Sequence, residues 1–273
     1  MMLMVMSLTC ISCSKYEDEN TENLQLKSSG VPVPVQEELY NQMWTDDFDT
    51  PFGLDYNWRL FGNPHYPLPA WVQGAYGRQG LFDNNGPSPL NNYAVSNKEF
   101  GKGLGYTIES EVLVKVLNPF GTCVCPGIAV ARYNTDFSEP PSQEKGIATG
   151  ISMRIVYAGA NATWFPARNR NHTWFIMDFL TETGSTLSSG YIDADRFVNN
   201  WHKLKIDVTP NRYVKFYCDN LVVWSPLNRL HPTMTSDKNI VLGFTSDGNQ
   251  ENRAGVAYHN YVKAIWVARP EIE

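Results

Sequence analysis

The sequence lacks an apolar run long enough to cross a membrane as a helix. A transmembrane helix needs about 20 apolar residues, and the apolar segment at residues 2–13 is much shorter. This segment ends on small residues and Cys13, and a polar, acidic stretch follows it, which is typical of a secretion signal that is removed. We therefore expect an exported protein whose mature chain begins at Cys13.

Positive charge and cysteine are scarce as well. The 22 Lys and Arg residues are outnumbered by 28 Asp and Glu residues, and they are scattered along the chain, which disfavours nucleic acid as a partner. Beyond the first segment the cysteines are Cys123, Cys125 and Cys218, which permit at most one internal disulfide. Cys123 and Cys125 share one face of an extended strand, so either could pair with Cys218, or all three could be free buried thiols.

Long amphipathic helices are also missing from the pattern, which allows only brief helical turns at residues 36–43 and 194–200. Charged residues, Asn, Ser and Pro dominate residues 14–43, and such a segment cannot bury enough apolar surface to offset its chain entropy. The sequence therefore predicts a flexible tether over residues 14–43 and a single folded domain over residues 44–269.

The domain shows instead a repeated alternation of apolar and polar residues over short segments. Over residues 106–114 the alternation places Ile108, Val112 and Val114 toward a core, and Glu109 and Glu111 toward water. Further strands are expected at residues 127–133, 151–157, 173–181, 203–208, 214–218, 221–224, 240–245 and 254–267, with clusters of Gly, Pro, Asn and Asp between them. Many short strands in a chain of this size predict an all-β fold, a two-sheet antiparallel jelly-roll sandwich.

Three segments resemble a known superfamily. Residues 200–208 with 213–222 are similar to the hairpin "W-h-x-L-x-I … v-x-F-Y-x-D-n-x-l" of concanavalin A-like lectin/glucanase domains. Residues 255–266 resemble the closing strand of these domains, and residues 44–49 followed by Trp58 resemble their first strand. The resemblance implies a concanavalin A-like sandwich but no particular activity, because this fold carries lectins, glycosidases, lyases and inert spacers alike.

The first residues resemble a second kind of signal. Cys10-Ile11-Ser12-Cys13 is similar to a bacterial lipobox, and Lys15 followed by an acidic tract is similar to the export signal of Bacteroidetes surface lipoproteins. This resemblance implies lipidation of Cys13, a membrane anchor and a place at the outer membrane or cell surface. Cys10 could be the lipidated residue instead, and an ordinary secretory signal would leave the protein periplasmic or secreted.

Catalytic motifs are few. The Glu-x-Asp-x-x-Glu strand of laminarinase-type glycosidases is missing, as are Gly-x-Ser-x-Gly, His-Glu-x-x-His and paired Cys-x-x-Cys motifs. Glu109 and Glu111 lie about 7 Å apart along one strand, which matches the carboxyl separation of inverting glycosidases. They are weak catalytic candidates together with Asp178, because Glu pairs on exposed strand faces are usually only solvated.

A ligand face is better supported than a catalytic site. Trp174 and Asp178 share one face of their predicted strand, whereas Phe175, Met177 and Phe179 face the core, and Arg154 is expected to point to the same outer face. Trp164 and His172 lie close by in a run that is rich in rings and hydrogen-bond donors. Exposed rings beside polar groups bind sugars, although each ring taken alone could equally belong to the core. The candidate ligand residues are Trp174, Asp178, Arg154, Trp164 and His172.

The superfamily resemblance also implies a structural calcium where the first and last strands meet. Asp47 matches the acidic position of that site, and Asn260 stands where an aspartate is usual. The amide keeps an oxygen ligand but removes a charge, which weakens a site for a hard cation.

Three functions follow from these observations. The first is a lipid-anchored surface protein that binds polysaccharide or oligosaccharide for a nutrient-uptake system. The second is a glycoside hydrolase or polysaccharide lyase with an unrecognised active site on the same fold. The third is a non-catalytic assembly module of the cell envelope.

Overall fold

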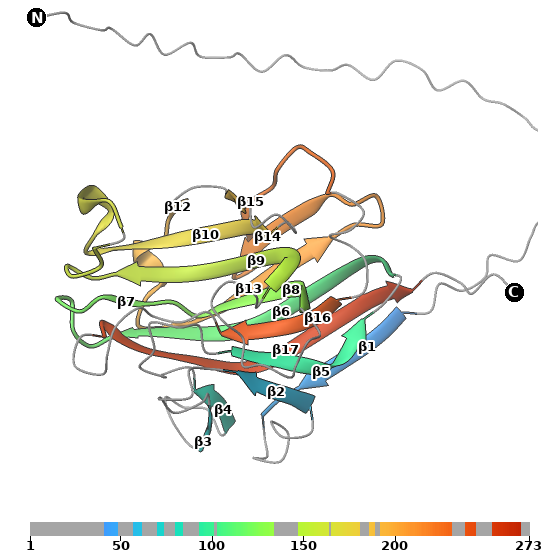
Figure 1. Ribbon diagram of the computed structural model, residues 1–273, viewed down its shortest axis with the longest axis horizontal. Coiled ribbons are helices and arrows are strands. Elements are labelled where there is room, and N and C mark those ends of the chain that lie inside the picture. Colours follow the sequence, from blue (N-terminus) through green and yellow to red (C-terminus); the bar gives the residue numbers. More distant parts are fainter. Residues whose placement is uncertain are drawn as a thin grey trace, which may run out of the picture. The chain divides into compact units, whose positions relative to one another are not determined.

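Two β-sheets packed face to face make up the body of the protein (Figure 1). The computed structural model describes residues 41–48, 57–61, 70–73, 80–83, 93–100, 103–133, 147–163, 165–180, 186–188, 192–230, 238–243 and 253–268. All of them belong to the compact unit Glu38–Glu273. Within these ranges no helix is both long and apolar enough to span a membrane.

The first sheet, sheet A, has eight strands in the order β15-β14-β13-β6-β17-β4-β3, with β1 also paired to β17. Its strands are β1 (Asn41–Asp46), β3 (Ala70–Gln73), β4 (Gly80–Asp83), β6 (Gly103–Val116), β13 (Trp201–Val208), β14 (Val214–Cys218), β15 (Leu221–Trp224) and β17 (Gly255–Ala268). Each of its pairings is antiparallel, and the pairing of β1 with β17 places these two strands side by side.

The second sheet, sheet B, has nine strands in the order β11-β10-β9-β8-β16-β5-β2, with β12 paired to β10 and β7 to β9. Its strands are β2 (Trp58–Phe61), β5 (Tyr93–Phe100), β7 (Cys123–Val124), β8 (Gly127–Tyr133), β9 (Ile147–Ala158), β10 (His172–Leu180), β11 (Thr186–Ser188), β12 (Ile192–Asp193) and β16 (Lys238–Gly243). Two single 3₁₀ turns, η1 (Ala167–Asn169) and η2 (Asp195–Phe197), flank β10 and β12.

The core fills the space between the two sheets. Sheet A contributes residues such as Ile108, Val112 and Ile206, and sheet B contributes Phe175 and Met177, all of them at most 2% exposed. Burying a side chain of this size contributes roughly 1.5–3 kcal/mol. At the β1 end the ring of Trp266 stacks between Tyr106 and Phe100, with ring centroids 4.5 and 4.8 Å away.

The structure confirms the predicted fold class and the main strands. The inward positions of Ile108, Val112, Val114, Phe175, Met177 and Phe179 are as predicted. The predicted helical turn at residues 36–43 is wrong for residues 41–43, which belong to β1 and pair with β17. Only Asp195–Phe197 of the turn expected at residues 194–200 is helical.

The three cysteines among the described residues are free thiols, which decides between the two alternatives that the sequence left open. Cys123, Cys125 and Cys218 are all buried and none is in a disulfide. Cys218 lies in the core between the sheets, whereas Cys125 packs on the outward side of sheet B. An internal bridge to Cys218 is therefore not formed.

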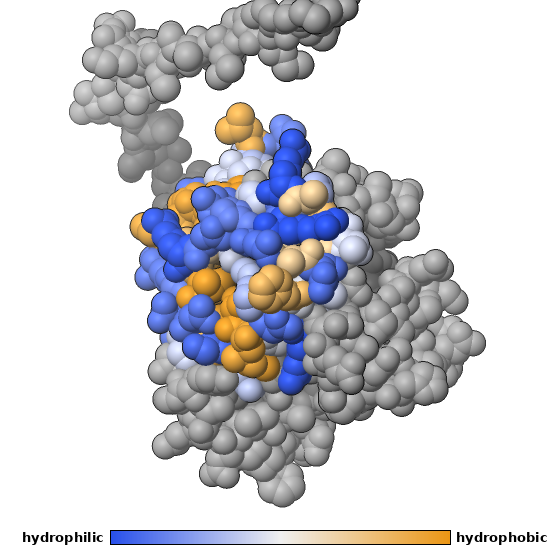
Figure 2. Space-filling view, turned by 90° about the vertical axis from the view of Figure 1, so that its left-hand side faces the viewer, coloured by the Kyte–Doolittle hydropathy of each residue, from blue (hydrophilic) through white to orange (hydrophobic). Residues whose placement is uncertain are grey.

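Close backbone contacts fix the end of the sandwich that carries β7 and η1, which faces the viewer in Figure 2. The N–H of Gly159 donates to Thr122 O over 2.6 Å, and a Cβ at Gly159 would lie 2.2 Å from Gly121 O. On this end hydrophobic side chains alternate with hydrophilic ones, and Leu117 and Phe120 are largely exposed.

Candidate functional site

The outward side of sheet B carries most of the predicted ligand residues. Since Phe175, Met177 and Phe179 point inward, the side chains between them on β10 point outward, and the antiparallel pairing with β9 sets Ile176 opposite Arg154 and Asp178 opposite Ser152. We call this surface the β9–β10 face; it consists of Ser152, Arg154 and Val156 on β9 and His172, Trp174, Ile176 and Asp178 on β10.

An ion pair holds the middle of the β9–β10 face. Arg154 Nη2 donates to Asp178 Oδ2, and the side chain of Asp178 is 8% exposed while that of Arg154 is 26% exposed. Cys125 lies beside this pair. Burial raises the pKa of the Cys125 thiol, although Arg154 acts in the opposite direction. The site therefore presents a guanidinium whose charge a nearly buried carboxylate balances, next to a neutral thiol.

Trp174 is held at one end of the same face. Its Nε1 donates to Asn169 O over 2.9 Å, and its ring centroid lies 4.3 Å from that of His172. His172 in turn contacts Asp195 through Nδ1, and its Nε2 lies 3.4 Å from Asp193 Oδ1. These contacts fix a half-buried indole in one orientation beside several hydrogen-bonding groups.

The β9–β10 face is less exposed to solvent than the sequence predicted for an outer strand face. Ser152, Val156 and Ile176 are all buried although they point away from the core. Ala162 and Phe165 from the turn after β9 pack against this side of the sheet, so Phe165 is a packing residue and not an exposed ring. Trp164, the remaining predicted ligand residue, lies outside the described residues.

The predicted catalytic carboxylates do not form one site. Glu109 and Glu111 lie on the outward side of sheet A, whereas Asp178 lies on sheet B. Tyr261 Oη donates to Glu109 Oε1 over 3.4 Å, and Asn260 Nδ2 donates to Glu111 Oε2 over 3.0 Å. The two glutamates thus remain neighbours on one strand face, with polar contacts to β17.

The predicted calcium residues lie near the junction of the first and last strands, since β1 pairs with β17 there. Asp47 is exposed, and the Asn260 amide is turned toward Glu111. The buried carboxylate of this region is Asp46, which accepts hydrogen bonds from Phe48 N, Asn57 Nδ2 and Trp58 Nε1 over 2.8–3.0 Å. Sequence reasoning did not single out Asp46, because alternation alone does not show which of two adjacent aspartates is covered.

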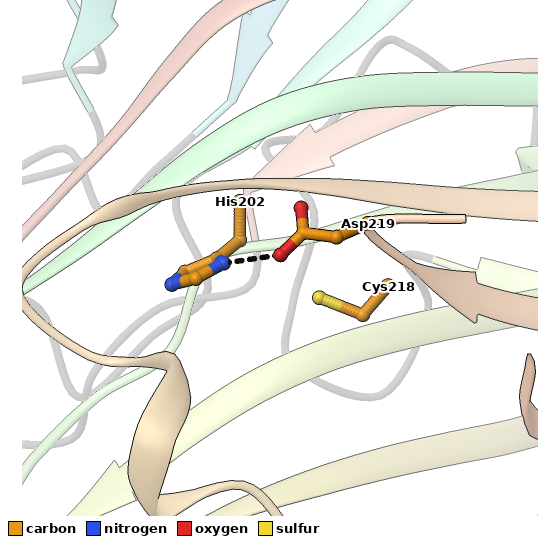
Figure 3. A group of neighbouring side chains, drawn as sticks. All are labelled: His202, Cys218 and Asp219. Carbon is orange, nitrogen blue, oxygen red and sulfur yellow. Dashed lines mark hydrogen bonds and ion pairs between the residues drawn. The ribbon is translucent and has the colours of Figure 1, made fainter. Parts of the chain in front are cut away.

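The described part of the chain contains two groups of His, Cys and Asp side chains that could bind a metal ion. Within each group the potential ligand atoms all lie within 4.8 Å of one another. One is His172 with Asp193 and Asp195, described above. The other is His202 with Cys218 and Asp219, in the hairpin of β13 and β14 (Figure 3). The side chain of His202 is only 13% exposed and contacts Asp219. The strand register, which the sequence did not show, brings these three residues together.

No family model matches the chain, and no curated protein matches it in sequence. Among solved structures, winged bean acidic lectin in complex with methyl-α-D-galactose is similar with a TM-score of 0.53 and 10% identity, over 84% of this chain and 100% of the lectin. A family 16 endo-glucanase from Bacteroides ovatus gives a TM-score of 0.49 at 10% identity, over 81% of this chain and 99% of its own. Carbohydrate binding module CBM66 from Bacillus subtilis gives 0.46 at 15% identity, over 76% of this chain and 94% of its own.

The similarity to the winged bean lectin confirms the fold that the sequence predicted. The two antiparallel sheets and the similarity to the winged bean lectin show a concanavalin A-like lectin/glucanase fold. At this level of identity the similarity concerns the fold alone.

Proposed function

We propose that the protein binds a polysaccharide or oligosaccharide on its β9–β10 face. The observation that carries this proposal is the fixed, half-buried indole of Trp174 on the same strand face as the ion pair of Arg154 and Asp178. Sugars present apolar C–H faces between hydroxyl groups, so they bind where a ring and polar groups lie side by side.

The local geometry suits this task. The ring of Trp174 needs no reorientation, because Asn169 O and the His172 ring already hold it, and a preorganised group loses little entropy on binding. Arg154 and Asp178 offer donors and acceptors to sugar hydroxyls while their charges balance. The winged bean lectin, which has the same fold, was solved with a bound galactoside, and this supports a sugar as the ligand class.

The proposal extends to the place where the protein acts. Cys13 carries the lipid, the residues between Cys13 and β1 form the tether, and the domain captures glycans at the outer membrane or cell surface for uptake. The lipobox-like sequence and the acidic tract that follows it support this part of the proposal.

Affinity electrophoresis in gels that contain plant, algal or host polysaccharides tests the binding function. We expect at least one polysaccharide to retard the wild-type protein, and Trp174→Ala to weaken this retardation about tenfold or more, because the variant loses the ring on which the sugar would stack. The matched control is Trp201→Ala, which removes a half-buried tryptophan from the outward side of sheet A.

The control variant should be retarded like the wild type. If no polysaccharide class retards the wild-type protein, or if Trp174→Ala and the wild type migrate alike, the β9–β10 face is not a sugar site.

A further inference from the structure

Three potential metal ligands of different kinds meet in the β13–β14 hairpin. His202 Nδ1 lies 2.6 Å from Asp219 Oδ2, and the sulfur of Cys218 completes a group whose ligand atoms are all within 4.8 Å of one another. Figure 3 shows the imidazole from β13, the thiol from the end of β14 and the carboxylate from the turn that follows β14 close to one another. Cys218 is fully buried, whereas the Asp219 side chain is 41% exposed. The group therefore lies at the border between core and solvent.

The hairpin holds these side chains in place. Asp219 and Asn220 form the two-residue turn that connects β14 with β15, with φ angles of 50° and 65°, a conformation that Asp and Asn tolerate well. Lys203 N donates to Asp219 Oδ1 over 2.9 Å, and Asp219 N donates to Lys203 O over 2.9 Å. The Phe197 ring packs edge-on against His202 at 5.0 Å. The Oδ1 contact leaves Oδ2 directed at the imidazole, as an outer-shell contact orients a metal-binding carboxylate.

We propose that His202, Cys218 and Asp219 bind a zinc ion, with water in the fourth position. Zinc accepts nitrogen, sulfur and oxygen ligands in a tetrahedron, whereas calcium and magnesium prefer oxygen ligands alone. The group at His172 differs, because it has no thiol and its two imidazole nitrogens face different carboxylates.

The binding of one zinc ion releases one proton to solvent. Without the ion, the neutral imidazole donates its single N–H, at Nδ1, to Asp219 Oδ2. When the ion binds between Nδ1 and Oδ2, this proton moves to Nε2 by exchange with solvent, and the Cys218 thiol gives its proton to solvent as the S–Zn bond forms. Burial raises the pKa of this thiol, and Asp219 raises it further, while Arg196 acts in the opposite direction. Because binding releases one proton, the apparent affinity should rise with pH.

Cobalt(II) serves as a spectroscopic substitute for zinc in the test. The full chain is freed of metal with a chelator and titrated with Co²⁺, and we expect one equivalent to produce visible tetrahedral bands and a thiolate-to-cobalt charge-transfer band that Zn²⁺ abolishes. Cys218→Ser should lose the charge-transfer band. Cys125→Ser, which alters another buried free thiol, should keep it.

A second pair of variants covers the case in which Cys218→Ser does not fold. Asp219→Asn keeps the turn and an acceptor for Lys203 N, and His202→Gln keeps a polar side chain; each should weaken Co²⁺ binding about tenfold or more. The proposal is overturned if the wild type gives no charge-transfer band, if the band survives in Cys218→Ser, or if both other variants bind Co²⁺ like the wild type.

Discussion

At the scale of single residues, the buried carboxylate of Asp46 fixes the chain where β1 ends. Its oxygens accept hydrogen bonds from the backbone of Phe48, which has a φ of 54°, and from the Trp58 indole in β2 of the other sheet. Trp58 and Phe48 are themselves core residues. One aspartate thus connects sheet A with sheet B through the buried Trp58 indole, and it also holds the backbone at Phe48.

Replacing this carboxylate should be costly. Asp46→Ala would remove the buried acceptor of Trp58 Nε1 and Phe48 N, and we expect the free energy of unfolding to fall by about 2–3 kcal/mol. Urea denaturation measures this change. Asp47→Ala, at the exposed neighbouring position, is the control and should stay within about 0.5 kcal/mol of the wild type. Equal losses in the two variants would contradict the role assigned to Asp46.

A buried histidine gives the stability a predictable pH dependence. His259 is completely buried beside Ser110 Oγ, and burial lowers its pKa to about 3. In the unfolded chain its pKa is near 6.5, so the unfolded state binds a proton between these two pH values and the folded state does not. The stability associated with the neutral ring is complete above pH 6.5 and is lost progressively as the pH falls toward 3.

Between pH 7 and pH 5 this difference should cost about 2 kcal/mol. His259→Gln keeps a hydrogen-bonding group near Ser110 but has no proton to gain, so its free energy of unfolding should vary less over this range by about that amount. Urea titrations of both proteins at several pH values measure the slopes. Parallel slopes would show that His259 does not govern the pH dependence.

At the scale of strands and turns, the sequence predicted what alternation encodes and missed what register decides. The inward positions of Phe175 and Met177 follow from their spacing, and so does the common face of Trp174 and Asp178. The pairing of Arg154 with Asp178 depends on which residue of β9 lies opposite which residue of β10, and alternation within one strand does not contain that information.

The closing strand shows the same limit. A register shift between His259 and Val262 lets Asn260 and Tyr261, although adjacent in sequence, both reach glutamates on the outward side of sheet A. Strict alternation would have separated the two side chains. The resemblance of residues 255–266 to a known closing strand therefore predicted the strand correctly but not the direction of each side chain.

The turn after β9 should tolerate almost no added volume. In Gly159→Ala the new methyl group would lie 2.2 Å from Gly121 O, and the backbone bonds from Gly159 N and Asn161 N to residues 121–122 leave no room to move apart. We expect a loss of about 2 kcal/mol or more by thermal or urea denaturation. Asn161→Ala, at an exposed position of the same turn, should change stability by less than about 0.5 kcal/mol. A stable Gly159→Ala variant would mean that this turn is not close-packed.

At the scale of the whole molecule, the two proposed sites belong to different sheets. The ion pair of Arg154 and Asp178 and the fixed ring of Trp174 lie on the outward side of sheet B, whereas the group around His202 belongs to sheet A and reaches the core through Cys218. The turn η2 contacts both groups, since Asp195 contacts His172 and Phe197 packs against His202. Each variant should therefore be measured in both the glycan and the cobalt experiment, so that an effect passed from one site to the other is detected.

The membrane anchor that we propose should be separable from the folded domain as well. Cys13 lies outside the compact unit Glu38–Glu273, so Cys13→Ser should remove the anchor without changing the unfolding transition. Several acyl chains on one cysteine hold a protein stably in a bilayer, at about 0.8 kcal/mol for each buried CH₂ group. We expect the wild type in the membrane fraction, with lipid on Cys13 and residues 1–12 removed by mass spectrometry, and Cys13→Ser in the soluble fraction or unprocessed. Cys10→Ser is the matched control and should stay with the membrane. An unmodified Cys13 in the wild type, together with unchanged fractionation of Cys13→Ser, would instead place the domain in the periplasm or outside the cell as a free protein.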